Sequence, residues 1–316
     1  PSKLHFTSHR VPAFDRWVAQ RRLQAVKRTA RRFRMDADPV LLIWHPNFRD
    51  MVGQFKERLV VYYVYDQYAG YTGSGGNTRS AGETELMSKA DIVFVLSKEL
   101  YEIKKRDAKN VIHLANAVDF DHFARARDAA TAVPDDMAAI APPRIGYIGT
   151  MNEKLNVPIL EALASAHREW SIVLVGRENY TNADEKRRFI QLTERPNVHW
   201  LPYKPPEQVP AYLKGLDVCM MCYVINGWTF YGDPSKLHEY LASGKPTVGV
   251  GLSSIREFSD VVIVADTPDE WVSAVEAGLR DTGPDITRRR IETARRNSYA
   301  ARIETFLAVI REALGE

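Results

Sequence analysis

The chain has 316 residues, of which 45% are hydrophobic and 26% are charged, with a formal net charge of only +3. These values are typical of a soluble globular protein with room for two domains of about 150 residues each. No apolar run approaches the roughly 20 residues that a membrane-spanning helix needs, and no export-signal pattern is present, so we expect a cytoplasmic protein. Cys219 and Cys222 are the only cysteines, which excludes a disulfide scaffold and a four-ligand metal site. Both lie in an apolar run and are predicted to be strand side chains.

The N-terminal part contains a predicted basic amphipathic helix, in which apolar residues recur at roughly helical spacing. Its basic residues are Arg16, Arg21, Arg22, Lys27, Arg28, Arg31, Arg32 and Arg34. One interpretation is a solvated helix face; the other is a surface that contacts anionic lipid or a phosphorylated acceptor. Nucleic acid is disfavoured, because no groove-reading or aromatic-interleaved motif accompanies the charge. Because the chain opens with Pro1 rather than methionine, we expect some N-terminal sequence to be missing.

Short apolar runs separated by helical or turn-rich segments predict parallel strands that are buried on both faces. These runs are 39–44, 59–64 and 92–96, followed by 144–148, 171–175, 198–201, 217–222 and 246–250. Alternation of strand and helix predicts an α/β fold with two doubly wound parallel sheets. We therefore expect a first Rossmann-like domain over 1–125 and a second over 144–290. The Ala-, Asp- and Pro-rich stretch 126–143 is predicted to be a linker, and the helical segment 291–316 is predicted to pack back on the first domain.

The most informative stretch is 232–246 (GDPSKLHEYLASGKP), which has the signals of a helix with two well-defined ends. Asp233 can cap the N-terminus, and Pro234 suits the first helical position. Gly244 suits the left-handed residue after the helix, and Pro246 prevents its continuation. The sequence therefore predicts a helix over 233–243.

Lys236 falls in the first turn of this helix, where the dipole and the free N–H groups favour negative charge. A bound diphosphate would make this lysine favourable, with the Ser235 hydroxyl and the free amides as further ligands. Glu239 lies one turn further along the same face, where a carboxylate can accept hydrogen bonds from both hydroxyl groups of a ribose. The alternative is a capped surface helix with a solvated lysine and glutamate.

This stretch resembles the P-x-K-x-x-E-Y-L-A-x-G-K-P signature of GT-B glycosyltransferases, particularly the retaining family-four type and its teichuronic-acid relatives. Residues 91–97 (DIVFVLS) and 116–119 (NAVD) are similar to the run that closes the first domain in such enzymes. Residues 144–149 (RIGYIG), with Lys154 shortly after, are similar to the opening of their nucleotide-binding domain. The resemblance implies two Rossmann-like domains that face a cleft, with an acceptor-binding first domain and a nucleotide-sugar-binding second domain.

The resemblance also implies roles for individual residues of the second domain. Glu239 would bind ribose, Ser235 and Lys236 the diphosphate, and the loop from Gly149 through Thr150 to Lys154 would close over the phosphates. Tyr203 and Lys204 fall where the family holds the base. The family-four pattern has an acidic residue eight positions before the ribose glutamate, whereas this chain has Tyr231 there.

In the first domain, Asp66 follows the predicted strand 59–64, at the edge where ligands bind in open parallel sheets. The xanthan glucuronosyltransferase, which this chain resembles in general layout, has its catalytic base in a comparable place. Asp66 is therefore a candidate base, although an Asp that starts a turn would give the same pattern. Glu83, at the start of the next predicted helix, and His45, after the strand 39–44, are further candidates for the catalytic site. Glu85 is an alternative to Glu83, and a structural histidine is the alternative for His45.

The Gly-, Ser- and Thr-rich loop 68–82 is expected to be mobile until a ligand orders it, and it lacks the pattern of a Walker loop.

The combined prediction is a metal-independent hexosyltransferase that moves a sugar from a nucleotide-diphosphate donor, with UDP preferred, to a glycan or lipid-linked acceptor in cell-surface polysaccharide synthesis. No metal or other cofactor is expected, since no Asp-x-Asp motif appears in a suitable loop. Arg21, Arg28, Arg31 and Arg32 would contact the acceptor or the anionic inner face of the plasma membrane, on which the enzyme would be peripheral. Two alternatives remain: a non-hydrolysing nucleotide-sugar epimerase, and an inactive nucleotide-sugar-binding subunit, for which Tyr231 is the one hint.

Overall fold

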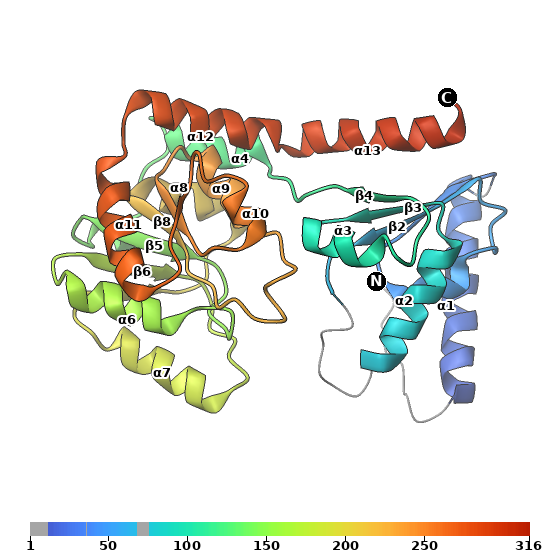
Figure 1. Cartoon of the computed structure of the whole chain (residues 1–316), viewed down its shortest axis with the longest axis horizontal. Coiled ribbons are helices and arrows are strands. Elements are labelled where there is room, and N and C mark those ends of the chain that lie inside the picture. Colours follow the sequence, from blue (N-terminus) through green and yellow to red (C-terminus); the bar gives the residue numbers. More distant parts are fainter. Residues whose placement is uncertain (1–11, 36, 68–75) are drawn as a thin grey trace. The chain divides into compact units, whose positions relative to one another are not determined.

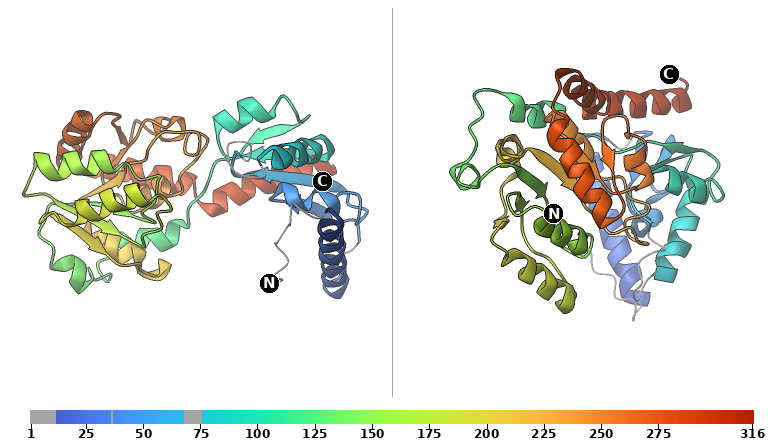
Figure 2. Two further views of the ribbon diagram at one scale, coloured as in Figure 1. Left: turned by 90° about the horizontal axis from the view of Figure 1, so that it is seen from below. Right: turned by 60° about the vertical axis from the view of Figure 1, so that its left-hand side comes forward.

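The computed structural model describes residues 12–35, 37–67 and 76–316. The chain forms two compact units, one comprising Pro1–Ala115 with Phe306–Glu316 and the other comprising Asn116–Thr305 (Figure 1). Each unit contains its own parallel sheet with helices packed against it (Figure 2). The prediction of an α/β fold with two parallel sheets is confirmed.

The first unit has a four-stranded parallel sheet in the order β1-β2-β3-β4. Its strands are β1 (Val40–Ile43), β2 (Leu59–Val64), β3 (Ile92–Val95) and β4 (Val111–His113). Its other elements are α1 (Pro12–Arg32), the 3₁₀ helix η1 (Pro46–Met51), α2 (Gly76–Lys89) and α3 (Lys98–Lys104). Phe306 and Ile310, near the C-terminus of the chain, pack against Leu59, Val61 and Phe94 of this sheet. The C-terminal helix therefore completes the apolar core of the first unit.

The second unit has a six-stranded parallel sheet in the order β10-β9-β8-β5-β6-β7. Its strands are β5 (Arg144–Ile148), β6 (Ser171–Val175), β7 (Val198–Leu201), β8 (Val218–Met221), β9 (Thr247–Gly249) and β10 (Ile263–Val264). Successive strands run outward from β5 in one direction and from β8 in the other, so the strand order reverses between β5 and β8. Ligands of open α/β sheets bind beyond the carboxyl ends of the strands at such a reversal.

Two layers of helices cover this sheet. In one layer, α6 (Val157–Ala166) contacts both α7 (Ala183–Thr193) and α11 (Pro268–Arg280). In the other, α4 (Phe120–Ala124) contacts α8 (Val209–Gly215) and α9 (Lys236–Ala242), and α9 contacts α12 (Pro284–Arg296). The remaining elements are η3 (Arg125–Arg127), α5 (Asp135–Ala138), η4 (Pro206–Gln208), α10 (Ser253–Arg256) and α13 (Tyr299–Leu314). Cys219 and Cys222 are buried in and directly after β8, and burial raises the pKa of both thiols to about 12.

The fold differs from the sequence prediction in the segment 126–143, which is part of the second unit rather than a linker. Met137 and Ile140 are buried in its apolar core. Asp136 accepts a hydrogen bond from the hydroxyl group of Tyr212 at 2.8 Å. The Ala-, Asp- and Pro-rich composition therefore reflects short turns packed on the unit, with two apolar anchors that composition alone does not reveal.

The C-terminal segment is also interrupted, whereas the sequence predicts a helical segment over 291–316. Helix α12 ends at Arg296 and α13 begins at Tyr299. Between them, the carbonyl of Asn297 accepts a hydrogen bond from Val118, whose own carbonyl accepts one from Tyr299. The backbone at the break thus pairs with another chain segment instead of continuing the helix.

Candidate functional site

A cavity of about 460 Å³ lies in the second unit, beyond the carboxyl ends of β5, β6 and β7. It is lined by Phe123, Ile148, Gly149, Thr150, Val175, Gly176, Arg177, Asn179, Tyr203, Lys204, Pro206, Val209, Lys236 and Glu239. Six residues of the predicted donor site are among them, from three segments far apart in the sequence: Gly149 and Thr150, Tyr203 and Lys204, and Lys236 and Glu239. Its size is within the range of small-molecule sites.

Helix α9, which carries Lys236 and Glu239, begins three residues later than predicted. Ser235 precedes the helix, and Asp233 does not cap it. Instead, the Asp233 carboxylate accepts a hydrogen bond from the backbone N–H of Asn116 at 2.6 Å, because the chain enters the second unit there. The C-terminal end is as predicted, since Gly244 has φ +76° directly after the Ser243 cap.

Tyr240 fixes this helix to the sheet. Its buried hydroxyl group accepts a hydrogen bond from the backbone N–H of Ile148, the last residue of β5, at 3.1 Å. The Ser235 hydroxyl donates to Glu239 Oε1 at 3.2 Å. Glu239 lines the cavity and Ser235 does not, so Ser235 acts on the cavity by orienting the Glu239 carboxylate.

Gly176 brings two strand ends close together. Its φ is +144°, and a Cβ atom at this position would lie 1.9 Å from the carbonyl oxygen of Gly149. The residues after β5 and β6 can approach each other in this way only because position 176 has no side chain. Gly149 and Gly176 both line the cavity.

Arg177 is a cavity residue that the sequence analysis missed. Its guanidinium carbon lies 4.2 Å from the centroid of the Tyr203 ring, and both residues line the cavity. The signal was present, because Arg177 follows a predicted strand and a glycine. Lys204 also lines the cavity, and its ammonium group lies 2.6 Å from Asp136. The hydrogen bond with this carboxylate raises the pKa of Lys204.

Lys154 does not line the cavity in this structure. Its ammonium nitrogen lies 4.0 Å from the centroid of the Trp228 ring. The neighbouring Glu153 accepts hydrogen bonds from the backbone of Thr181 and Asn182. Although desolvation opposes it, these bonds lower the pKa of Glu153 to about 2.

In the first unit, Asp66 is half-buried just beyond the carboxyl end of β2, as predicted, and accepts a hydrogen bond from the Gln67 N–H at 2.8 Å. The Nδ1 atom of His45 accepts from the N–H of Asn47 at 3.1 Å and caps η1. The Nδ1 atom of His45 thus has a structural role, which agrees with the alternative of a structural histidine.

The assignment of Glu83 to the catalytic site is corrected by the structure. Glu83 lies inside α2, is 2% exposed, and forms an ion pair with the buried Lys104 at 2.8 Å. Tyr62 donates a further hydrogen bond to the same carboxylate oxygen at 3.3 Å. A carboxylate enclosed by a cation and a hydroxyl group is a packing element, because no acceptor hydroxyl can reach it in this structure. Sequence position alone does not distinguish the buried face of α2 from its exposed face.

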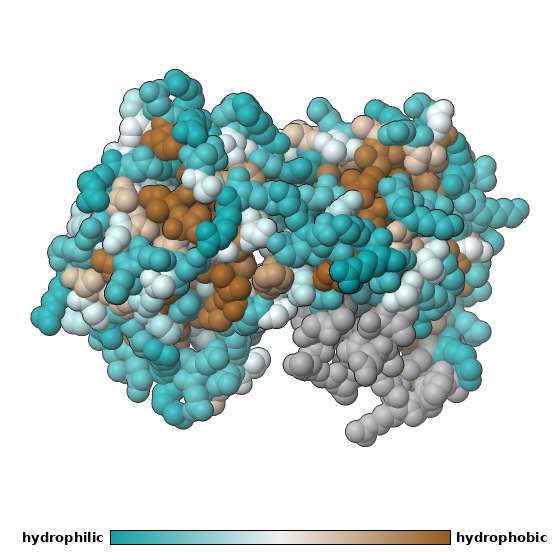
Figure 3. Space-filling model, viewed as in Figure 1, coloured by the Kyte–Doolittle hydropathy of each residue, from teal (hydrophilic) through white to brown (hydrophobic). Residues whose placement is uncertain are grey.

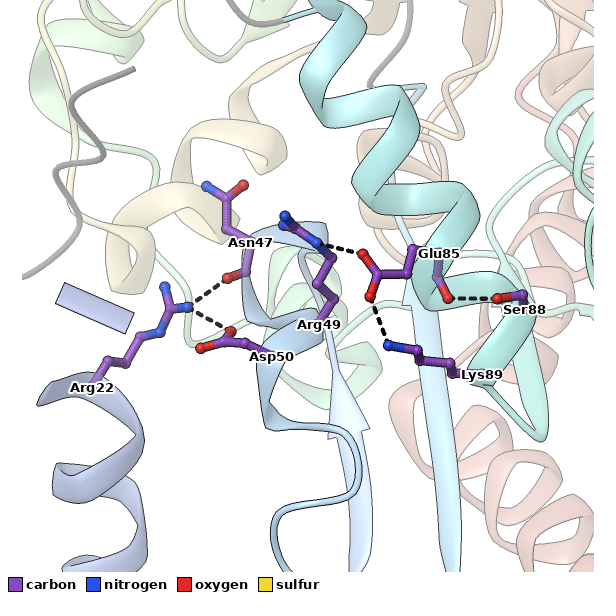
Figure 4. Close-up of polar contacts among 7 residues, drawn as sticks. All are labelled: Arg22, Asn47, Arg49, Asp50, Glu85, Ser88 and Lys89. Atoms are coloured by element: carbon purple, nitrogen blue, oxygen red, sulfur yellow. Dashed lines mark hydrogen bonds and ion pairs between the residues drawn. The ribbon is translucent and has the colours of Figure 1, made fainter. Parts of the chain in front are cut away.

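The alternative candidate Glu85 lies on the exposed face of α2. Figure 4 shows its carboxylate between Arg49 and Lys89, at 2.9 Å and 2.6 Å. Both hydrogen bonds lower the pKa of Glu85, and the hydrogen bond from Lys89 has the larger effect. A base with a depressed pKa and two cationic partners is a weak proton acceptor.

The predicted mobile loop 68–82 is only partly within the described residues. Residues 68–75 lie outside them, and residues 76–82 form the first turns of α2 rather than a loop. Gly82 is close-packed, since a Cβ atom there would lie 3.1 Å from the Arg49 guanidinium. Gly82 therefore belongs to a packed helix rather than to a loop.

The basic N-terminal helix is present as α1 and ends with Arg31 and Arg32. One of its arginines is not on the solvated face: Arg22 reaches Asp50 at 2.7 Å and the carbonyl of Asn47 at 2.6 Å (Figure 4). Arg21, Arg28, Arg31 and Arg32 are exposed. Phe14 and Trp17 are also exposed, and their rings stack at 6.0 Å.

Across the described residues, no helix has the length and hydropathy to cross a membrane, and hydrophilic side chains predominate on the face drawn in Figure 3. Within the same residues, no group of three or more His, Cys, Asp or Glu side chains is arranged to hold a metal ion.

Residues 142–281 match the family model described as glycosyl transferases group 1. Over 217 residues the chain is 28% identical to TuaH of Bacillus subtilis, which is named as a teichuronic acid biosynthesis glycosyltransferase. That alignment covers 65% of this chain and 52% of TuaH, so the chain spans about half the length of this curated relative.

Among solved structures, sucrose-phosphate synthase from Thermosynechococcus elongatus matches with a TM-score of 0.73 at 14% identity, over 99% of this chain and 82% of that one. HepE from Anabaena, solved in complex with UDP-glucose, matches with a TM-score of 0.72 at 14% identity, over 93% of this chain and 82% of that one. The chain thus has the GT-B fold, and its residues 142–281 are similar to the glycosyl transferases of group 1.

Proposed function

We propose that this protein is a glycosyltransferase that binds a UDP-sugar in the cavity of its second unit and transfers the sugar to a glycan or lipid-linked acceptor in cell-surface polysaccharide synthesis. The observation that carries this proposal is that Lys236 and Glu239 line one cavity with Gly149 and Thr150. The group 1 match and the UDP-glucose complex of the structural neighbour HepE support it.

The cavity supplies the chemistry that a nucleotide-diphosphate donor requires. The Lys236 ammonium and the Arg177 guanidinium are cations that can stabilise the diphosphate and the charge that develops on it as the glycosidic bond breaks. Glu239, oriented by Ser235, can accept hydrogen bonds from ribose hydroxyl groups. The Tyr203 ring offers a stacking surface for the base.

In the transfer step, the acceptor hydroxyl oxygen forms a bond to the anomeric carbon, and the bond from that carbon to the diphosphate oxygen breaks. The nucleoside diphosphate leaves with the electron pair. We propose Asp66 as the base that takes the hydroxyl proton, with no metal ion required. Asp66→Asn should lower kcat at least 100-fold while leaving UDP affinity unchanged, and undiminished kcat would exclude this role.

Calorimetric titration of UDP, GDP and ADP tests the donor site. We expect UDP to bind, and we expect Lys236→Ala and Glu239→Ala each to weaken binding at least tenfold, or about 1.4 kcal/mol. Lys109→Ala and Glu194→Ala, at exposed positions on other surfaces, are the matched controls. Folded protein that binds none of the three nucleotides would refute the proposal.

Product analysis then separates transfer from epimerisation. With UDP-sugar and an acceptor, a transferase releases UDP and a glycosylated product. An epimer or glycal formed without any acceptor would instead identify an epimerase, and binding without turnover would identify an inactive subunit.

We further propose that the exposed face of α1 binds anionic membrane from the cytoplasmic side. Its exposed arginines and its exposed Phe14 and Trp17 combine positive charge with interfacial aromatic rings. Arg28→Glu with Arg32→Glu should abolish sedimentation with phosphatidylglycerol vesicles, whereas Arg106→Glu with Lys109→Glu should not. Equal binding of both double variants would contradict this part of the proposal.

A further inference from the structure

A second cavity, of about 770 Å³, lies at the opposite end of the second unit's sheet. Its lining includes Pro143, Asp217 and Pro246, which directly precede strands β5, β8 and β9. The cavity of about 460 Å³ that we propose as the site of the nucleotide-sugar donor, called the donor cavity below, lies beyond the carboxyl ends of strands in the same sheet. Because β5 has five residues, the two cavities are separated by roughly 16 Å of strand.

Cationic side chains dominate the charge of this second cavity. Arg127, Lys214 and Lys245 line it, against a single carboxylate, that of Asp217. Asp217 is itself engaged, since one of its oxygens accepts a hydrogen bond from the Arg144 N–H at 2.7 Å. The positive charge therefore exceeds the negative charge in this cavity.

The cations have only neutral partners. Arg127 Nε donates to the carbonyl of Ala242 at 3.0 Å, and Lys214 Nζ donates to the carbonyl of Asp128 at 2.6 Å. In the part of the chain that the structure describes, none of Arg127, Lys214 and Lys245 has a carboxylate oxygen within the 4.0 Å of an ion pair. Lys214 and Lys245 are half-buried, whereas Arg127 is exposed. A group of cations without a counterion attracts an anion.

Arg127 also faces a like charge. The guanidinium carbons of Arg127 and Arg295 lie 5.8 Å and 4.5 Å from the centroid of the same Phe120 ring. Burial, together with repulsion from Arg295, lowers the pKa of Arg127. An anion at this position would relieve the repulsion between the two guanidinium groups.

The remaining lining residues indicate the chemistry of the part of the ligand that carries no charge. Ser243, Thr282 and Thr287 bring hydroxyl groups, and Pro142, Pro143, Pro246 and Leu279 bring apolar surface. Hydroxyl groups beside flat apolar surface suit a ring that carries hydroxyl groups of its own, and the volume is that of a small-molecule site.

We propose that this cavity is a second ligand site, distinct from the donor cavity, that binds a small phosphorylated sugar through Arg127 and Lys245. The phosphate group would lie between these two side chains, and the sugar would pack against the prolines. This site stands independently of the proposed transferase activity.

Calorimetric titration of glucose 1-phosphate, with glucose and inorganic phosphate as comparison ligands, tests the proposal. The titration is made with and without saturating UDP and is repeated in Glu239→Ala, so that neither outcome depends on the donor cavity. We expect saturable binding of glucose 1-phosphate in both backgrounds, weaker binding of phosphate, and none of glucose.

The variant Arg127→Gln with Lys245→Gln should weaken binding of glucose 1-phosphate at least tenfold, whereas the control Lys109→Gln should leave it unchanged. Thermal unfolding of each variant shows that it is folded. Absence of saturable binding, equal loss in the control, or competition by UDP would each overturn the proposal. Failure of UDP to bind would refute the donor site but not this one.

Discussion

The side chain of Lys236 occupies the space above Gly149: a Cβ atom at position 149 would lie 2.6 Å from Cε of Lys236 and 2.7 Å from the hydroxyl group of Tyr147. Gly149 and Lys236 both line the cavity that we propose as the donor site. The absence of a side chain at position 149 therefore determines where the ammonium group of Lys236 can lie.

Replacing Gly149 with alanine should displace Lys236, because the flexible lysine gives way before the backbone does. We expect UDP affinity to fall at least tenfold and stability to fall by about 1–3 kcal/mol. Calorimetry and denaturant unfolding measure the two effects. Unchanged UDP affinity would show that the position of Lys236 does not matter for binding.

Replacing Gly176 with alanine should instead act on the fold. The new Cβ atom would lie 1.9 Å from a backbone oxygen, and φ at this position is +144°, so the strand ends must separate. We expect a loss of about 2–5 kcal/mol in the free energy of unfolding. Gly53→Ala is the control for backbone conformation alone, since Gly53 also has positive φ but has nothing within 4 Å of its Cβ position. A similar loss in both variants would mean that the close contact contributes nothing.

The buried pair of Glu83 and Lys104 should be structural. Lys104→Met leaves the Glu83 carboxylate buried without its cation, and we expect a loss of about 3–5 kcal/mol. Glu83→Gln with Lys104→Met removes both charges and should recover most of that loss. The double variant should also keep transferase activity. Its inactivity in a folded protein would reinstate Glu83 as a catalytic residue.

His238 should make the second unit sensitive to acid. Its ring is fully buried, and neither ring nitrogen has a hydrogen-bond partner among the described residues. Burial, with a smaller effect of Arg302, lowers its pKa from 6.5 to about 4. The unfolded chain therefore binds more protons than the folded one between these pH values, and the stabilisation present above pH 6.5 is lost as the pH falls toward 4.

His238→Leu should remove this contribution, which amounts to about 3 kcal/mol over the full interval. Denaturant unfolding at pH 7, 6, 5 and 4.5 compares the variant with the wild type. We expect the two proteins to diverge as the pH falls, with the variant losing less stability. Parallel pH profiles would show that His238 is solvated or paired in solution.

Much of the fold follows from local sequence patterns. Strands such as β5 and β6 are short apolar runs buried on both faces of a parallel sheet, and such runs are recognisable without any partner. The turn after α9 is equally local, because Gly244 must adopt positive φ there. By contrast, β4 and β10 span three and two residues, too few to show any periodicity.

The donor cavity is predictable to the extent that its residues follow strands. Gly149 and Tyr203 lie just after β5 and β7, and parallel strands bring such segments to one edge of the sheet. Lys236 and Glu239 lie in α9, the helix that connects β8 to β9. Lys154 also follows a strand, but its ammonium group lies over the Trp228 ring instead. Whether a side chain turns into the cavity depends on the loop that carries it, and loop conformation is not a property of strand periodicity.

The sequence by itself determined the parallel α/β class, the helix with Lys236 and Glu239, and the glycine after it, because each depends on neighbours within a few residues. Only the tertiary structure decided that Glu83 is buried with Lys104, that Asp233 pairs with Asn116 rather than capping α9, and that Arg127, Lys214 and Lys245 line one cavity. These relationships join residues from 21 to 118 positions apart, as in Lys104 with Glu83 and Arg127 with Lys245. Contacts across such separations depend on how whole elements pack, and no local pattern records them.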